Sequence, residues 1–205
     1  TDADSLGFWG KDWTKHFEPN ASAIVFPKST QQVQAIVKLC NELNIVITPS
    51  GGRTGLSAGA VAANGEVVIS LDKMNKVLAF YPADRMVEVE AGIVTKALQD
   101  FAQQQGLYYP VDFASAGSSQ LGGNIGTNAG GIKVIKYGMT RNWILGMTVV
   151  TGKGDILHLN KGIIKNATGY DLRHLFIGAE GTLGIVTEVQ VKLERQPKNL
   201  TVMVL

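Results

Sequence analysis

The chain has 205 residues, 45% of them hydrophobic, which is enough to bury a core in one domain or in two small ones. Its 19 Lys and Arg residues against 17 Asp and Glu give a net charge of +2, without the clustered basic face of a nucleic-acid-binding protein. Cys40 is the single cysteine, so an internal disulfide and a CxxC metal cluster are excluded. No apolar run approaches the about 18 residues of a membrane helix, so we expect a cytoplasmic protein, with a peripheral position at the inner membrane left open.

The first third of the chain predicts strands that alternate with one helix. A buried strand over residues 23–27 is followed by a capping pair, Ser29-Thr30, and by apolar residues at helical spacing. Further strands are expected over residues 45–48 and 67–71. This order predicts a small parallel sheet. The loop after residue 48 then leaves the carboxyl end of a strand, where open α/β sheets usually place ligands.

After residue 75 the pattern changes to antiparallel hairpins. Residues 77–80 and 86–90 flank one turn, and residues 144–151 and 156–159 flank another. Such hairpins predict a larger sheet with mainly antiparallel strands.

The remaining elements complete an α+β fold. We expect a helix over 94–105, an extended segment over 108–116, a short helix at His174, an alternating strand over 185–193 and the start of a strand over 201–205. The chain divides into a lead-in (1–20) without a recognisable pattern, a first subdomain with the parallel strands (21–75) and a second with the antiparallel sheet flanked by helices (76–200).

Glycine is the compositional outlier, with 24 residues in 205 against about 7% in an average protein. The run over residues 49–59, PSGGRTGLSAG, follows the predicted second strand. Bare glycine backbones let N–H groups converge on the oxygens of a ligand, and Arg53 adds a cation. This run suits a diphosphate, and an ordinary mobile loop is the alternative. It is not the dinucleotide fingerprint G-x-G-x-x-G, which the chain lacks, nor a P-loop, since residues 146–153 have one residue too many between glycines.

Two further segments have the same character. Residues 115–131 add hydroxyl and amide side chains, which can hydrogen-bond to ribose, ribityl or heterocycle edges, although a glycine-rich loop between strands is the alternative. Residues 166–172 and 178–185 make up the third segment. Three such segments, separated along the chain, indicate one long cofactor.

The histidines and carboxylates predict no catalytic machinery. His16, His158 and His174 are not paired at metal-ligand spacing, and no Ser-His-Asp order or close carboxylate pair stands out. We therefore expect no metal and leave the catalytic residues unassigned. The sequence indicates a protein that holds a cofactor.

These segments resemble a known family. Residues 49–59, residues 122–131 with 136–138, and residues 178–185 are similar to the FAD-linked oxidases with a PCMH-type (vanillyl-alcohol-oxidase-like) FAD-binding domain. Within that family the chain most resembles bacterial D-lactate, glycolate and D-2-hydroxyglutarate dehydrogenases. The resemblance extends from about residue 22 to residue 197. It implies FAD lying between the two subdomains.

The resemblance also implies the cofactor-binding residues. The pyrophosphate is expected on the backbone N–H groups of the first segment, at Pro49, Ser50, Gly51, Gly52, Arg53, Thr54 and Gly55. The flavin and ribityl chain are expected along Pro110, Asp112, Ser115, Gly117 and Ser118, and that wall continues with Gly122, Gly123, Asn124, Thr127, Asn128, Gly130, Tyr137 and Gly138. The adenine or ribose side is expected against Gly181, Gly184, Ile185 and Val186.

Two departures from the family pattern bear on the chemistry. Relatives that bind the flavin covalently often carry His after the Gly-Gly pair, where this chain has Arg53, so we expect non-covalent FAD. Family enzymes continue into a cap domain that supplies the catalytic base and most substrate contacts, whereas this chain ends at Leu205. The resemblance therefore implies a small 2-hydroxy-acid substrate bound through a missing cap domain, with an unidentified electron acceptor. Unranked candidates for the flavin N1 and O2 edge are Lys133, Lys136, Arg141 and His174.

Three functions follow from the sequence. The first is the FAD-binding half of a dehydrogenase that oxidises a D-2-hydroxy acid by hydride transfer to flavin N5. The second is the FAD-binding half of a non-redox member of the family, similar to the alkyl-glycerone-phosphate synthases. The third is a non-catalytic nucleotide-binding module.

Overall fold

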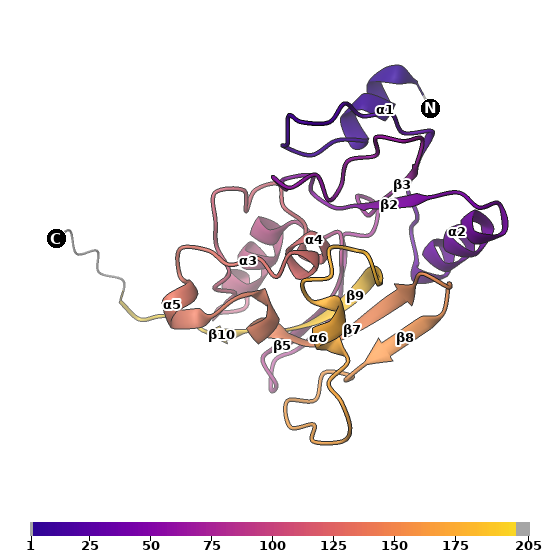
Figure 1. Cartoon of the computed structure of the whole chain (residues 1–205). Helices are drawn as coiled ribbons and strands as arrows, with labels where there is room; N and C mark the ends of the chain where they lie inside the picture. Colours follow the sequence, from indigo (N-terminus) through magenta and orange to yellow (C-terminus); the bar gives the residue numbers. More distant parts are fainter. Residues whose placement is uncertain (1, 200–205) are drawn as a thin grey trace.

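The computed structural model describes residues 2–199, and the strand expected over residues 201–205 lies outside this range. Strands β1 (Ala23–Val25), β2 (Ile47–Ser50) and β3 (Val67–Ser70) form the predicted parallel sheet, in the order β1-β3-β2 (Figure 1). Helix α2 (Thr30–Glu42) connects β1 to β2 and begins after Ser29, whose side chain accepts a hydrogen bond from the Gln32 N–H. The first glycine run therefore leaves the carboxyl end of β2, as the sequence predicts.

The second sheet contains five strands in the order β4-β5-β9-β7-β8. All its pairs are antiparallel, and both predicted hairpins are present. The strands are β4 (Val77–Tyr81), β5 (Met86–Glu90), β7 (Ile144–Thr151), β8 (Ile156–Leu159) and β9 (Gly184–Lys192). Short strands β6 (Leu107–Tyr108) and β10 (Glu194–Arg195) pair separately.

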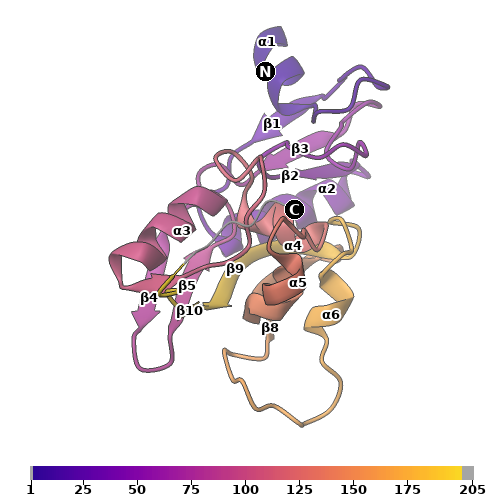
Figure 2. The same cartoon turned by 90° about the vertical axis from the view of Figure 1, so that its left-hand side faces the viewer.

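One core connects the two sheets. It includes Val33 of α2 and Ile69 of β3 together with Val89 of β5 and Val189 of β9, each with no exposed surface. Helix α3 (Thr95–Gln104) buries its apolar face, with Leu98, in the same core. In two perpendicular views the parallel sheet lies above the antiparallel one, and α4 (Leu121–Gly126) lies between them (Figures 1 and 2). Loops from both sheets can therefore reach the same region near α4.

Several short helices were not expected from the sequence. Residues 1–20 were expected to lack a pattern, yet α1 (Ala3–Trp9) forms there, capped by the Asp2 side chain. Helix α4 falls within the second glycine-rich segment, although three of its six residues, Leu-Gly-Gly-Asn-Ile-Gly, are glycine, a poor helix former. The others are α5 (Val134–Tyr137) and η1 (Thr140–Trp143), while α6 (Arg173–Phe176) is the short helix expected at His174. None of the helices within residues 2–199 combines the length and apolar character that a membrane span requires.

Candidate functional site

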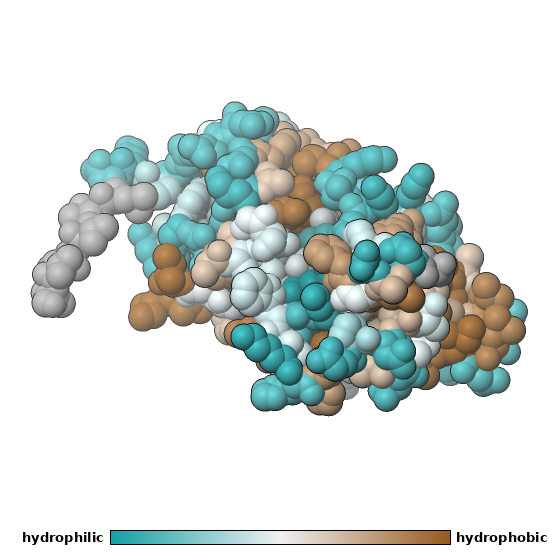
Figure 3. Space-filling model, turned by 90° about the horizontal axis from the view of Figure 1, so that it is seen from above, coloured by the Kyte–Doolittle hydropathy of each residue, from teal (hydrophilic) through white to brown (hydrophobic). Residues whose placement is uncertain are grey.

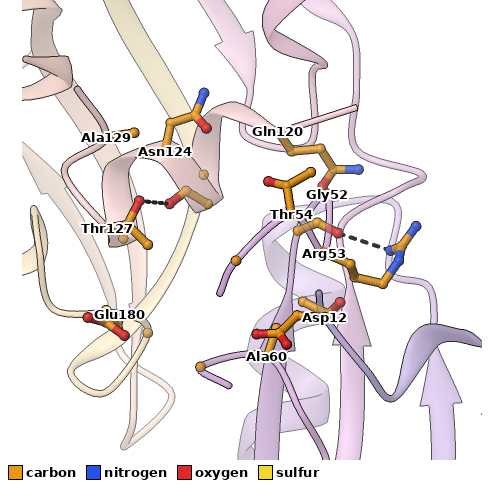
Figure 4. Close-up of a pocket in the computed structure, with 18 of the residues that line it drawn as sticks. Asp12, Gly52, Arg53, Thr54, Ala60, Gln120, Asn124, Thr127, Ala129 and Glu180 are labelled. Atoms are coloured by element: carbon orange, nitrogen blue, oxygen red, sulfur yellow. Dashed lines mark hydrogen bonds between the residues drawn. The ribbon is translucent and has the colours of Figure 1, made fainter. Parts of the chain in front are cut away.

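A pocket of about 710 Å³ lies where the three glycine-rich segments meet. Residues 49–60 form one wall, residues 113–130 a second, and residues 176–186 a third (Figure 4). Asp12, Trp13 and Leu71 complete the lining. Seen from above, the middle of the surface has near-neutral hydropathy between polar and apolar areas (Figure 3). A pocket of this size accommodates a large organic ligand.

Most of the expected site residues line this pocket. They are Pro49, Ser50, Gly51, Gly52, Arg53, Thr54, Gly55, Ser115, Ser118, Gly122, Gly123, Asn124, Thr127, Gly130, Gly181, Gly184, Ile185 and Val186. Six expected residues do not line it: Pro110, Asp112, Gly117, Asn128, Tyr137 and Gly138. The structure thus brings together all three segments, but not every residue within them.

The first wall presents a row of free backbone donors. Among residues 2–199, no acceptor is found for any backbone N–H from Gly51 to Ser57. Arg53 has a φ of 58° and Ala58 a φ of 63°, so the backbone is in the left-handed region at both residues and the loop does not continue strand β2. Backbone N–H groups nearly always have a hydrogen-bond acceptor, and where the protein provides none, water or a ligand does. Consecutive free N–H groups in such a loop form an anion-binding concavity.

The first and second walls approach each other too closely for a side chain at Gly52. A β-carbon at Gly52 would lie 2.2 Å from the Ser118 carbonyl oxygen, and one at Gly51 would lie 3.5 Å from the Gly123 nitrogen. At Gly123, by contrast, a β-carbon would meet no atom within 4 Å. Glycine is therefore needed at Gly52 for packing, whereas Gly123 leaves open space beside the pocket.

Three buried polar atoms of pocket-lining residues have no hydrogen-bond partner in the part of the chain that the structure describes. They are Asp12 Oδ2, Ser50 Oγ and Gln120 Oε1, and all three residues line the pocket. The amide of Gln120 is oriented by its Nε2, which donates to Asp72 Oδ1 at 2.6 Å. Because buried polar atoms are nearly always partnered, three unpaired ones around one pocket fit a site built for a polar ligand.

The guanidinium of Arg53 is engaged outside the pocket. It donates to the Gly51 carbonyl oxygen at 2.9 Å, the bond dashed beside Arg53 in Figure 4. It also lies 3.4 Å from Asp72 and stacks over the rings of Phe8 and Trp9. Burial by itself raises the pKa of Asp72, but the hydrogen bond from Trp9 and the charge of Arg53 hold that pKa below its usual value. The Arg53 side chain, expected to add a cation for the ligand, therefore fixes the shape of the loop.

Side chains of the second wall are held from behind. The amide of Asn124 donates to Thr95 Oγ1 at 2.6 Å, and Thr95 in turn shares a 2.7 Å hydrogen bond with Ser119. Thr127 Oγ1 bonds the Gly123 carbonyl oxygen at 3.1 Å. The Asn124 bond holds α4 against α3, the Thr127 bond closes the end of α4, and the glycines of α4 line the pocket.

The expected residues outside the pocket hold residues 128–143 in place. Asp112 binds Lys133 at 2.8 Å, and the Tyr137 carbonyl oxygen accepts from Trp143 Nε1 at 2.9 Å. The Asn128 side chain accepts from the Arg141 N–H at 3.1 Å. Gly138 has a φ of 74°, Pro110 is buried, and Gly117 is exposed. None of the four candidates for the flavin edge, Lys133, Lys136, Arg141 and His174, lines the pocket.

Sequence reasoning missed several lining residues. Asp12 and Trp13 lie in the lead-in, and Gln120 precedes α4. Glu180 has a φ of 51°, and a β-carbon at Gly59 would lie 3.2 Å from its Oε2. The Ala-Glu-Gly turn was a signal for Glu180, but nothing in the sequence pattern marked Asp12. Within the described residues no cluster of His, Cys, Asp or Glu could hold a metal ion.

The comparison with protein families decides the kind of ligand. A family model described as "FAD binding domain" matches residues 21–160. The chain belongs to this family. The predicted resemblance is confirmed, and the cofactor of this FAD binding domain is FAD.

Relatives of this FAD binding domain are longer proteins. The chain is 71% identical, over all 205 residues, to 44% of a D-2-hydroxyglutarate dehydrogenase of Stutzerimonas stutzeri (strain A1501). It is 43% identical, over 96% of its length, to 40% of a D-lactate dehydrogenase of Anaerostipes hadrus. A solved structure of alkyldihydroxyacetonephosphate synthase matches 86% of the chain with a TM-score of 0.75 and 31% identity, and the chain covers 34% of it. The chain spans less than half the length of these relatives.

Proposed function

We propose that this FAD binding domain serves a dehydrogenase that oxidises a D-2-hydroxy acid, with D-2-hydroxyglutarate as the first candidate. The 71% identity to a D-2-hydroxyglutarate dehydrogenase over the whole chain carries this proposal. The D-lactate dehydrogenase at 43% identity supports the same substrate class. Bound FAD supplies the hydride acceptor, flavin N5, for such a reaction.

The residues of the chain bind and orient the cofactor in this proposal. The free N–H groups from Gly51 to Ser57 hold the diphosphate of FAD, because consecutive backbone donors stabilise an anion without a side-chain charge. The flavin and ribityl chain lie along the wall of residues 113–130, and the adenosine lies toward residues 180–186. The two subdomains, residues 21–75 and 76–200, hold the cofactor between them, which agrees with a pocket lined from both.

FAD is held without a covalent bond in this proposal. Arg53 stands where covalent relatives often carry His, and its guanidinium is bound to Gly51 and Asp72. The one cysteine, Cys40, is buried in α2 and does not line the pocket. Substrate contacts and the catalytic base come from a cap domain, as the resemblance implies. The electron acceptor stays unassigned, and the cytoplasmic location expected from the sequence stays a prediction.

Reduction of the flavin tests the proposed reaction. Full-length protein reconstituted with FAD is mixed with D-2-hydroxyglutarate under anaerobic conditions, and the visible flavin absorbance is followed. We expect the absorbance to be lost with the D-enantiomer and kept with the L-enantiomer. Only the D-enantiomer, bound in the site, would point the hydrogen of its hydroxyl-bearing carbon toward flavin N5. An unchanged spectrum with D-2-hydroxyglutarate, D-lactate and glycolate contradicts the dehydrogenase proposal.

A second candidate is a group-transfer enzyme that keeps FAD. The alkyldihydroxyacetonephosphate synthase structure, with a TM-score of 0.75, favours this alternative over a nucleotide-binding module without flavin. The same experiment separates the candidates. Protein that binds FAD but is not reduced by any of the 2-hydroxy acids supports the group-transfer alternative.

A further inference from the structure

The segment from Phe8 to Thr14 is fixed to the outside of the first glycine loop. Trp9 Nε1 donates to Asp72 Oδ2 at 2.7 Å, and the Trp13 N–H donates to the Gly55 carbonyl oxygen at 3.0 Å. Phe8 lies against the Arg53 guanidinium, 5.2 Å from the ring centre. This segment is therefore attached at both ends to the loop that the proposed function places on the diphosphate.

Between these attachments Asp12 lies at the edge of the pocket, among the residues that line it. Its Oδ1 accepts from the Thr14 N–H at 2.8 Å, which makes a local turn. Its Oδ2 is buried and has no partner within residues 2–199, although the residue is only 8% exposed. A β-carbon at Gly55 would lie 3.4 Å from Oδ2. In Figure 4 Asp12 lies beside Ala60, across the pocket from Thr127 and Glu180.

The chemistry of a carboxylate restricts what can meet this oxygen. An ionised carboxylate only accepts hydrogen bonds, so its partner must be a donor. A diphosphate oxygen carries negative charge and is repelled at short range. The partner is therefore an uncharged donor, a hydroxyl or an amine. FAD carries such groups on both sides of its diphosphate, in the ribityl chain and in the adenosine.

We propose that Asp12 accepts a hydrogen bond from a hydroxyl or amine group of FAD, which makes the segment Phe8–Thr14 part of the cofactor site. The inference rests on the proposed placement of FAD in the pocket. It assigns a binding role to a part of the chain that lies outside the matched range of residues 21–160.

The substitution Asp12→Asn tests the role of the unpaired oxygen Oδ2 alone. The Asn side chain keeps one oxygen for the Thr14 N–H and replaces Oδ2 by an NH₂ group, which cannot accept. We expect FAD to bind about 10- to 100-fold more weakly to the stripped full-length protein, because a hydrogen bond to a charged group is lost. Thermal unfolding of the FAD-free variant is expected at the same temperature as the parent or higher, since the variant removes an unpaired buried charge.

Asp4→Asn is the matched control. Asp4 is an exposed acidic residue of α1 in the same region, and its side chain makes no hydrogen bond within residues 2–199. Titrations of FAD, ADP and FMN by calorimetry are compared across the three proteins. Weaker FAD and ADP binding to Asp12→Asn, with unchanged FMN, supports a donor on the adenosine side. Weaker FAD and FMN binding, with unchanged ADP, supports a donor on the ribityl side.

Two results overturn the inference. The first is FAD affinity of Asp12→Asn equal to that of the parent and of Asp4→Asn, which means that Oδ2 has no partner on the cofactor. The second is lower stability of the FAD-free variant in proportion to its weaker binding, which means that Asp12 acts only through the fold. Parent protein that binds no FAD contradicts the proposed function itself, and the inference with it.

Discussion

At the residue scale, Gly52 shows how close packing creates the pocket. Its backbone passes the Ser118 carbonyl oxygen at a distance that leaves no room for a β-carbon, which would lie 2.2 Å away. This approach keeps the first glycine loop against the start of α4, so that the two segments border one pocket. The glycine is required there by contact with another segment.

Gly52→Ala tests this role. The added methyl group forces the two segments apart, so we expect a loss of about 1–3 kcal/mol in the free energy of unfolding together with weaker FAD binding. Chemical denaturation and FAD titration measure the two effects. Gly117→Ala is the control, because a β-carbon there meets no atom within 4 Å, and its stability should stay within about 0.5 kcal/mol of the parent. Equal stability of both variants with the parent would show that the contact at Gly52 can relax freely.

At the scale of elements, Asp72 connects three parts of the chain. It accepts from Trp9 of α1, pairs with Arg53 of the first glycine loop and accepts from Gln120 at the start of α4. Its side chain is 24% exposed, so these interactions are only partly screened by solvent. The carboxylate therefore fixes the relative positions of two pocket walls and of the segment that carries Asp12.

The lowered pKa of Asp72 predicts a dependence of stability on pH. A carboxyl group whose pKa is lower in the folded state stabilises the fold above its unfolded-state pKa, and this contribution is lost as pH falls through the folded-state pKa. The difference in unfolding free energy between the parent and Asp72→Asn should be largest at neutral pH and shrink as pH falls below the ordinary value of 3.8. Urea unfolding at several pH values measures it. A difference that does not change with pH would mean that the charge of Asp72 makes no contribution.

The strands of the parallel sheet and the position of the first glycine loop could be predicted because they depend on local patterns. Apolar runs indicated β2 and β3. Because the glycine loop directly follows β2, it had to lie at the carboxyl end of that strand in the parallel sheet. Helix α4 could not be predicted, because its glycines disfavour a helix and its packing against β9 and η1 is not visible in the local sequence. The lead-in gave no periodic signal, since its fixed position depends on the contacts of Trp9 and Trp13 with distant residues.

At the scale of the whole molecule, two sheets with one core bring three distant segments to one pocket. Sequence motifs indicated which segments take part. They did not indicate which residues within a segment face the pocket, because that depends on tertiary contacts. Asp112 and Tyr137 flank the second segment, yet Asp112 pairs with Lys133 and Tyr137 packs against Tyr108 and Trp143.

In the proposed complex the free N–H groups of residues 51–57 hold FAD. Hydrogen–deuterium exchange of the full-length protein, followed by mass spectrometry with and without FAD, tests it most directly. Without FAD these amides have no acceptor within residues 2–199, so they should exchange rapidly. Bound FAD should slow exchange in peptides from this loop and from residues 118–130. Peptides from β8, far from the pocket lining, should be unchanged. If FAD binds and exchange at residues 51–57 stays as fast as before, these N–H groups do not hold the cofactor.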